Sequence, residues 1–467
     1  MRSAPHQSTI RFGVQPWLRE LRPSTEHVRL DVQQTWREKL ALNSNRPPKH
    51  PPPGFINSLF VENKVTDMLP FIAPFSLLST LQLASSFDFE AACTLSNLSN
   101  TRFSNKTTLF DASLVPAGST LQFPDADASC AAAPQPIVAD MCRITMLVET
   151  SESSSINMEA WLPRNWTGRL LSLGNSALGG CIEYEDLAYT SSLGFKAVSA
   201  NNGHNGTSGA AFENSPQVLA DFAYRSVHMG VVIGKELTKA FYGQKHTKSY
   251  YSGCSTGGQQ GIKSVEDFPE DFDGEPPLSI LTPSSLGSAI SLPGGETNPY
   301  LLQALSGEPS ILAAKWFEYA VYNSSFDPKM LTMEDYKYAI RSNPFNIATF
   351  KGDVCPFRER GGKVLVYHGQ ADGLTTPKIL ERYHEQVQEV SGGDPKDLDE
   401  YFRLFRISGM EHCFGGPGAW EIGATGSSAL SVDADKNVLV ALVKWVERGE
   451  GPETIEGVKY FAVQAFL

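Results

Sequence analysis

The sequence lacks the features that mark several large classes of protein. None of its seven cysteines forms a C-x-x-C pair, which excludes the usual zinc-ribbon and thioredoxin motifs. Basic residues are in deficit, with 39 Lys and Arg against 51 Asp and Glu, and the resulting charge of −12 would repel phosphate backbones. No apolar run is long and unbroken enough to span a membrane. We therefore expect neither nucleic acid nor a membrane as a partner.

The composition is that of a globular chain with a large core. Apolar residues make up 41% of the 467 residues and charged residues 19%. Short apolar runs alternate with helical patterns, and this alternation predicts a parallel sheet with helices on both faces. The expected strands are 170–173, 196–200, 249–252, 363–368 and 401–407, and the expected helices are 217–242, 256–266 and 436–448.

The first 85 residues differ from the rest of the chain. Residues 1–67 are rich in Arg, Pro and Gln and contain no cysteine, so we expect a disordered extension. Residues 68–85 are a short, proline-broken apolar run followed by small residues, which resembles a signal peptide without its charged n-region. The alternative is a flexible tail followed by a buried apolar segment. The signal-peptide interpretation leaves a catalytic domain at 86–467.

Glycosylation sequons favour the secretory pathway. Five N-x-S/T sequons occur, and all of them follow residue 85. A single sequon often arises by chance, but this distribution fits a secreted, extracellular glycoprotein in which most cysteines are paired. The odd cysteine count then leaves one thiol over. The sequons are Asn97, Asn105, Asn165, Asn205 and Asn323.

A G-x-S-x-G motif supplies a candidate nucleophile. Gly253-Cys-Ser-Thr-Gly257 follows a predicted strand and precedes a predicted helix, which is the context of a nucleophile elbow. Such a tight turn needs small residues on either side of the serine, and it places the serine at a helix N-terminus that favours developing negative charge. A glycine-rich turn without function is the alternative. We expect Ser255 to be the nucleophile.

A serine nucleophile needs a base and an orienting acid, which in α/β-hydrolases follow it in the order acid, then histidine. Asp372 follows the strand at 363–368, and His412 follows the strand at 401–407. Both therefore lie at carboxyl ends of strands, where such sheets place their sites. For each one taken singly, an ordinary loop residue is an equally good interpretation, but together they predict a triad with Ser255 on an α/β-hydrolase fold. The competing side chains, which we expect to be structural or solvated, are His204, His228, His368, His384 and Glu411.

Cysteines adjoin two members of this triad. Cys254 immediately precedes the serine, and Cys413 immediately follows the histidine. This pattern resembles the tannase and feruloyl esterase family of fungi and bacteria, in which a disulfide joins the Cys-Ser and His-Cys motifs. The resemblance covers about residues 88–274 and 350–467. The matching segments are 174–182, 199–206, 250–261, 268–274, 367–372 and 409–418.

The resemblance implies three disulfides and an oxyanion hole. A Cys254–Cys413 bond would fix the serine loop against the histidine loop and, by closing a long loop, would stabilise the fold by about 4 kcal/mol. Spacing and family likeness together pair Cys93 with Cys142 and Cys130 with Cys181, and leave Cys355 over. The backbone N–H of Thr256 is the first expected oxyanion donor, and analogy places the second at Gly179 or Gly180.

The sequence departs from the family between the elbow and the aspartate. The family carries a large lid there, usually with an Asp-rich calcium loop, but Ser255 and Asp372 are only 117 positions apart. The likeness stops after Gly274, and 274–312 has the composition of a loop. We expect a reduced lid at about 275–350, no calcium, and no other metal or cofactor.

These residues imply a secreted serine carboxylesterase that acts through an acyl-enzyme. The resemblance makes the acid phenolic, namely ferulate or a related hydroxycinnamate on plant cell-wall esters. Three alternatives remain: a tannase that releases gallate, a pseudoenzyme or carbohydrate-binding protein that kept the triad but lost the pocket, and, with less support, a serine peptidase.

The proposed signal peptide predicts where the secreted protein begins. We expect the mature N-terminus near residue 86, because small residues at 84–86 follow the apolar run. Mass spectrometry of secreted material measures this directly. A peptide from residues 1–67 in that material would contradict the expectation.

Overall fold

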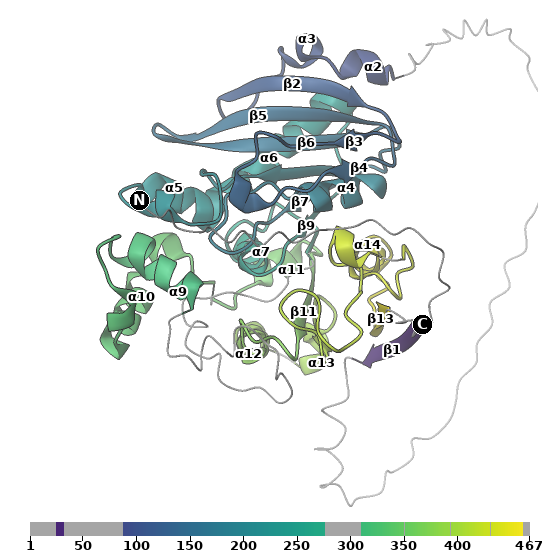
Figure 1. The fold of residues 1–467 in the computed structure, drawn as a ribbon. Coiled ribbons are helices and arrows are strands. Elements are labelled where there is room, and N and C mark those ends of the chain that lie inside the picture. Colours follow the sequence, from purple (N-terminus) through teal and green to yellow (C-terminus); the bar gives the residue numbers. More distant parts are fainter. Residues whose placement is uncertain are drawn as a thin grey trace, which may run out of the picture.

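The central feature of the fold is a nine-stranded mixed sheet (Figure 1). The computed structural model describes residues 25–31, 87–275, 310–349, 351–392, 394–429 and 431–460. In spatial order the strands are β12 (Phe402–Ile407), β11 (Lys363–Gly369), β10 (Gly274–Glu275), β9 (Lys248–Ser252), β7 (Arg169–Leu173), β8 (Lys196–Ala200), β6 (Ser154–Pro163), β5 (Met141–Ser151) and β2 (Thr107–Val115).

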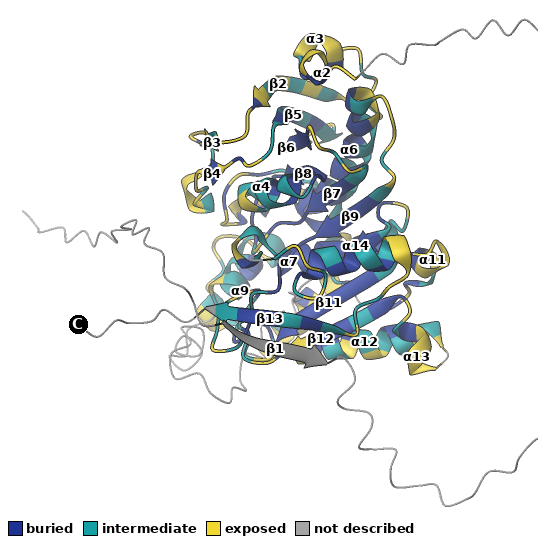
Figure 2. Ribbon diagram, turned by 90° about the vertical axis from the view of Figure 1, so that its right-hand side faces the viewer, coloured by how far each residue is buried: buried dark blue, intermediate teal, exposed yellow. Residues whose placement is uncertain are grey.

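The first six of these strands are parallel, and helices cover both of their faces. One face packs on α4 (Tyr184–Ser192) and α14 (Val438–Arg448). The other face packs on α6 (Ser226–Tyr242), α7 (Thr256–Asp267) and α12 (Lys378–Ser391). Because water is excluded from both sides, every residue of β8 is buried, and the inner strands are dark blue in Figure 2. The predicted parallel sheet is confirmed for this half of the molecule.

The other half of the sheet is antiparallel, which the sequence pattern did not predict. β6 pairs with β8, β5 with β6, and β2 with β5, all antiparallel. Their alternating side chains fill a separate core with α2 (Phe89–Ala92), α3 (Leu95–Leu98) and part of α6. The Cys93–Cys142 disulfide fastens α2 to β5. The remaining short strands are β3 (Thr120–Leu121), which pairs with β4 (Gln135–Pro136), and β1 (Thr25–Asp31), which pairs with β13 (Thr454–Tyr460).

The long helix predicted at 217–242 is continuous but irregular. It consists of α5 (Pro216–Ala220), a π-helical turn at Asp221–Arg225, and α6. The wide turn places a fully buried carboxylate against the antiparallel strands, where Asp221 accepts hydrogen bonds from Thr150, Ser154 and Arg225. The apolar spacing predicted the helix but not this π-helical turn, whose extra residue shifts the position of the buried face along the helix.

Two sequence-based expectations concern segments that are only partly described. Strand β1 lies within the extension that we expected to be disordered, and there Thr25–Asp31 pair with β13. The rest of residues 1–67 lie outside the described residues. The proposed signal peptide at 68–85 lies outside the described residues. Among the described residues, no helix combines the length and the apolar character needed to cross a membrane.

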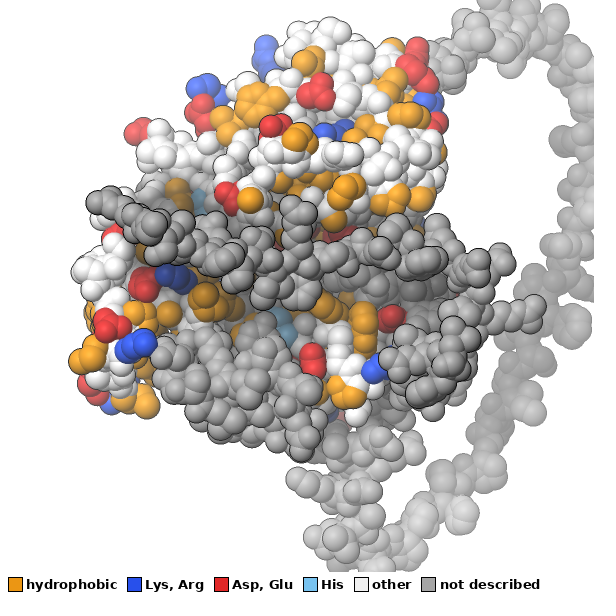
Figure 3. Space-filling model, in the orientation of Figure 1, with side chains coloured by type: hydrophobic (Ala, Val, Ile, Leu, Met, Phe, Trp, Pro, Cys, Tyr) orange, Lys and Arg blue, Asp and Glu red, His pale blue; other side chains and the backbone are white. Residues whose placement is uncertain are grey.

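The segment expected to form a reduced lid contains helices in its described part. They are α9 (Ile311–Trp316), a π-helical turn at Phe317–Val321, and α10 (Met333–Ser342). α9 and the π-helical turn pack on Leu178, Phe212 and Phe222 and so lie beside the loops that follow β7 and β8, and α10 contacts the π-helical turn. Apolar side chains remain exposed on these helices, among them Ile311 and Met333. Figure 3 shows hydrophobic side chains on the surface of this part of the molecule. The remaining helices are α11 (Cys355–Glu359) and α13 (Pro395–Leu398).

A buried lysine predicts an unusual pH dependence of stability. The side chain of Lys196 is fully buried and donates to the Gly234 carbonyl at 2.7 Å, with no carboxylate partner among the described residues. Burial lowers the pKa of Lys196 well below its usual value. The unfolded chain therefore binds one more proton than the folded chain between the lowered pKa and about pH 10.4, and stability rises with pH across that window.

Lys196→Met removes this proton-linked cost and is expected to raise the free energy of unfolding at pH 6–7 by at least about 1 kcal/mol. The Gly234 carbonyl keeps a bond from Thr238. The difference in the free energy of unfolding between Lys196→Met and the unmodified chain should shrink as the pH approaches 10. Denaturant titrations at several pH values measure this difference, with Lys239→Met at an exposed site on α6 as control. A constant difference at every pH would contradict the linkage.

Candidate active site

Ser255 lies on a strained turn between β9 and α7. Its backbone has φ 61° and ψ −118°, a conformation that residues other than glycine rarely adopt. Glycines make the turn possible, because a Cβ atom at Gly253 would lie 2.8 Å from the Gly257 carbonyl carbon, and one at Gly257 would lie 2.8 Å from the Asn175 oxygen. The serine is 4% exposed and stands at the N-terminus of a 12-residue helix. This is the strand–turn–helix arrangement of a nucleophile elbow.

His412 and Asp372 lie at the carboxyl ends of neighbouring parallel strands, β12 and β11. His412 Nδ1 contacts Asp372 Oδ2 at 2.8 Å, and the carboxylate is 4% exposed. Its other oxygen accepts the backbone N–H groups of Leu374 at 2.9 Å and Thr375 at 2.8 Å. Burial alone would raise the pKa of Asp372, but hydrogen bonds from His368 and His412 outweigh it and hold the pKa well below its usual value. Asp372 is therefore ionised and orients the His412 ring.

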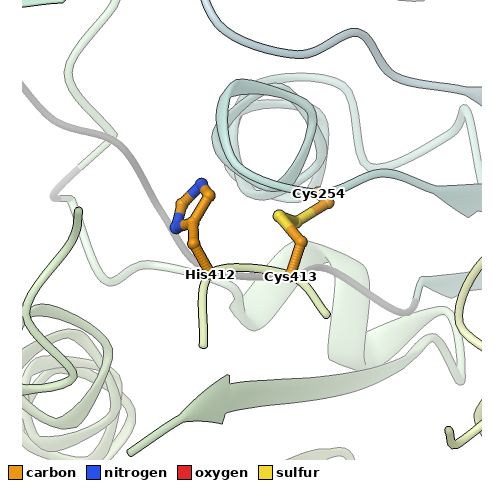
Figure 4. A group of neighbouring side chains, drawn as sticks. All are labelled: Cys254, His412 and Cys413. Atoms are coloured by element: carbon orange, nitrogen blue, oxygen red, sulfur yellow. A yellow bond between two sulfur atoms is a disulfide. The ribbon is translucent and has the colours of Figure 1, made fainter. Parts of the chain in front are cut away.

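A disulfide joins the loop of the serine to the loop of the histidine. Cys254 and Cys413 are 159 positions apart in sequence, and their Cα atoms lie 6.0 Å apart. A ring nitrogen of His412 lies within 4.8 Å of both sulfur atoms, and Figure 4 shows the ring and the bond side by side. Because the two sulfurs are bonded to each other, this His–Cys–Cys group offers no thiolate for a metal. The predicted pairing of these two cysteines is present.

The second ring nitrogen of His412 is the atom that would serve as a base. With Nδ1 bonded to Asp372, the opposite atom, Nε2, is buried and has no hydrogen-bond partner among the described residues. A buried nitrogen without a partner is costly, and such atoms are characteristic of sites that bind or react. The disulfide to Cys254 holds this loop against the elbow that carries Ser255. Ser255 gives Nε2 no hydrogen bond among the described residues, so the role of His412 as the base for Ser255 stays a prediction.

His368 contacts Asp372, which was not predicted from the sequence. It lies on β11, as expected, and is 1% exposed. Its Nε2 lies 3.1 Å from Asp372 Oδ2 and 3.1 Å from the Thr375 carbonyl, and because both partners are acceptors, this nitrogen carries the proton. Asp372 Oδ2 is thus held between two imidazoles. His368 and Asp372 are four residues apart in the sequence. One lies on a strand and the other in the loop that follows, and no regular period predicts that two such residues meet.

The structure gives the predicted oxyanion donors different surroundings. The Thr256 N–H lies in the first turn of α7, where no intrahelical acceptor exists, and the Thr256 hydroxyl binds the Ala177 carbonyl at 2.5 Å. The N–H of Gly179 is bonded to the Ser176 carbonyl, and that of Gly180 to the Gly206 carbonyl. Both amides already have acceptors, so the assignment of the second donor to Gly179 or Gly180 is wrong for this structure.

The other candidate side chains lie elsewhere or have structural partners. His204 binds the Leu178 carbonyl through Nε2 at 2.9 Å, and His228 binds Asp271 at 2.8 Å. His384 is on α12 against Phe402. His412 bonds to Asp372, and its neighbour Glu411 is not needed for that role.

The remaining cysteines and the sequons also take defined places. The structure joins Cys130 to Cys181 and leaves Cys355 as a half-buried free thiol. Four sequon asparagines are exposed, and the fifth, Asn105, is half-buried. The exposed four are Asn97, Asn165, Asn205 and Asn323.

A family profile matches the regions that build this site. Its description is tannase and feruloyl esterase, and it matches residues 142–277 and 318–465. The chain belongs to the tannase and feruloyl esterase family. The matched stretches include the elbow, the aspartate and the histidine, and they leave out residues 278–317, which fall in the segment where we expect the lid to be reduced.

Named proteins with similar sequences support membership of the tannase and feruloyl esterase family. Proteins named probable feruloyl esterase B-2 from Aspergillus flavus and Aspergillus terreus are each 38% identical to this chain. The alignments cover 82% and 84% of this chain, and 91% and 92% of the relatives. The predicted family resemblance is confirmed.

Solved structures agree with the fold. An esterase from Aspergillus oryzae has a TM-score of 0.73 at 37% identity and covers 80% of this chain and 92% of its own. Feruloyl esterase B from the same organism has a TM-score of 0.70 at 32% identity and covers 78% of this chain and 92% of its own. A tannin acyl hydrolase from Aspergillus niger shares the fold, with a TM-score of 0.58 at 16% identity. The predicted α/β-hydrolase class is confirmed.

The geometry of His368 predicts a role in holding the carboxylate. His368→Leu removes one of four donors to Asp372, which should lower kcat roughly tenfold, because one such bond contributes about 1–2 kcal/mol. KM should change little, since His368 is buried behind the aspartate. Steady-state kinetics with an ester substrate measure both constants.

His368→Gln is the matched control, because its amide can return an N–H group near the position of Nε2 and should recover most of kcat. Equal losses in the Leu and Gln variants, together with equal losses in melting temperature, would show that the imidazole only fills space.

Proposed function

We propose that this chain is a serine carboxylic ester hydrolase that releases a phenolic acid through an acyl-enzyme. The observation that carries the proposal is the buried His412–Asp372 bond on a loop tied by the Cys254–Cys413 disulfide to the strained Ser255 turn. Burial, a fixed imidazole tautomer and a serine at a helix N-terminus are the elements that acyl transfer requires.

The proposed reaction has two steps. His412 Nε2 takes the proton of Ser255 as Oγ attacks the ester carbonyl, and Asp372 stabilises the imidazolium that forms. The Thr256 N–H donates to the oxyanion. When the ester bond breaks, the imidazolium returns its proton to the leaving alcohol. A water molecule, deprotonated by the same nitrogen, then attacks the acyl-enzyme, and its proton restores Ser255. Every proton transfer uses this chain's own groups, so we propose no metal or cofactor.

The relatives favour a hydroxycinnamate as the acid. The proteins named feruloyl esterase B are 32–38% identical to this chain, whereas the tannin acyl hydrolase is 16% identical. We therefore propose ferulate, or a close analogue, esterified to plant cell-wall sugars as the substrate, with gallate esters as the second candidate. Three disulfides and four exposed sequons support an extracellular place of action.

Turnover of three esters tests the proposal. Methyl ferulate, methyl gallate and a short nitrophenyl ester should all be hydrolysed, with the highest kcat/KM for methyl ferulate. Ser255→Ala should lower kcat at least about 10⁴-fold, because the nucleophile is lost while the fold remains. Ser96→Ala, at an exposed serine on α3, is the control.

Three results would contradict parts of the proposal. Activity that survives Ser255→Ala would remove the serine from the mechanism. A higher kcat/KM for methyl gallate than for methyl ferulate would assign gallate, not ferulate, as the acid of the substrate. Binding of cell-wall sugar by a correctly folded chain without any turnover would support the carbohydrate-binding alternative.

A further inference from the structure

A cavity separate from the candidate active site lies on the antiparallel half of the sheet. It has a volume of about 410 Å³, which is within the range of small-molecule sites. Strands β2, β5 and β6 form one wall, and the loops around Phe123, Gly180 and Asn205 form the others. None of Ser255, Asp372 and His412 lines it. The mechanism proposed above makes no use of this space.

The floor of the cavity is a preorganised set of polar and aromatic groups. Glu159 is 4% exposed and accepts two bonds from Arg143, at 2.8 and 2.5 Å, and one from Trp161 at 2.8 Å. Arg143 also lies over the ring of Phe123, which stacks on Tyr184 with the planes 11° apart. A buried ion pair on a sheet face costs desolvation energy, and apolar residues would stabilise the fold at least as well. These side chains therefore indicate a binding role.

The floor retains hydrogen-bonding capacity. Arg143 uses Nε and Nη2 for Glu159, so its Nη1 group has no protein partner among the described residues. The side chain of Asn157 also lines the space. Amide, guanidinium and carboxylate groups at fixed positions are suited to a ligand with several hydroxyl groups, each of which donates and accepts.

An exposed aromatic side chain stands at the rim. Pairing between β2 and β5 passes from Leu109 opposite Met146 to Asp111 opposite Thr145, so Phe110 is the extra residue of a β-bulge. Bulges re-aim side chains, and this one presents Phe110, 55% exposed, at the cavity. Exposure of a large apolar ring has no benefit for folding, but it offers a flat surface for the C–H face of a sugar ring.

We propose that this cavity binds a neutral sugar. Asp125, Asp127 and Glu159 outnumber Arg143 among its charged residues, so an anionic ligand is disfavoured. A pyranose offers one C–H face and a rim of hydroxyl groups, which match Phe110 and the polar floor respectively. The inference deepens the proposed function, on which its biological meaning rests: the site would hold the polysaccharide part of a feruloylated substrate away from the scissile ester.

The same chemistry has a second source in this chain. Asn205, an exposed sequon asparagine, lines the cavity and accepts a hydrogen bond from Asn201 at 2.9 Å. A glycan attached there would begin at the cavity wall. The sugar that occupies the site is therefore either part of the substrate or the glycan of the enzyme itself, and the experiment must separate the two.

Calorimetry with xylohexaose tests the proposal, using the full chain with Ser255→Ala so that no chemistry intervenes. Thr207→Ala is added in half of the samples, because it removes the Asn205 sequon but keeps the asparagine. The sequon-free protein should bind the oligosaccharide, and Phe110→Ala should weaken binding at least about fivefold. Leu114→Ala, an exposed apolar residue on the same strand, should have no effect.

Binding with and without the sequon would assign the site to substrate sugar, and binding only without it would assign the site to the glycan on Asn205. No binding by the sequon-free protein, or equal weakening by Phe110→Ala and Leu114→Ala at unchanged melting temperature, would overturn the proposal. Methyl ferulate turnover by the unmodified chain is measured in parallel. Its failure would remove the proposed esterase activity and leave the sugar result standing.

Discussion

The covalent link between Cys254 and Cys413 is the constraint on which the site depends. The serine is carried by a turn between β9 and α7, and the histidine by a loop after β12, three strands away in the sheet. Both loops contain a residue with positive φ, at Ser255 and at Cys413, so neither adopts a relaxed conformation. The two loops bring the cysteine Cα atoms to 6.0 Å from each other, and one sulfur–sulfur bond fixes both strained loops at once. Without it, the position of the proposed base relative to the proposed nucleophile would depend on loop packing alone.

Several hydrogen bonds in the site serve to hold the Asp372 carboxylate in place. Asp372 accepts two backbone amides and two imidazoles, which fills the capacity of both oxygens. A buried charge would be costly without these donors, and with them it has only one orientation. That orientation selects the tautomer of His412, and the tautomer determines which nitrogen is available to react.

Much of the candidate site was predictable from the sequence, because short motifs of neighbouring residues mark its main side chains. The motif around Ser255, the strand-end positions of Asp372 and His412, and the adjoining cysteines each follow from neighbours in the chain. The contact of His368 with the carboxylate was not predictable, because it depends on how the loop after β11 turns back. The oxyanion assignment to Gly179 and Gly180 failed for a similar reason, since backbone partners across loops leave no mark in the sequence.

Strand β10 has only two residues, yet it pairs on one side with the strand that leads to the nucleophile and on the other with the strand that leads to the acid. The polypeptide leaves the sheet after β10 and returns at α11 and β11, next to where it left. The segment between β10 and β11 therefore begins and ends at adjacent strands. Insertions and deletions within it leave these end points in place. The strands that lead to Ser255 and Asp372 can therefore be inherited unchanged while the length and sequence of the segment between them vary.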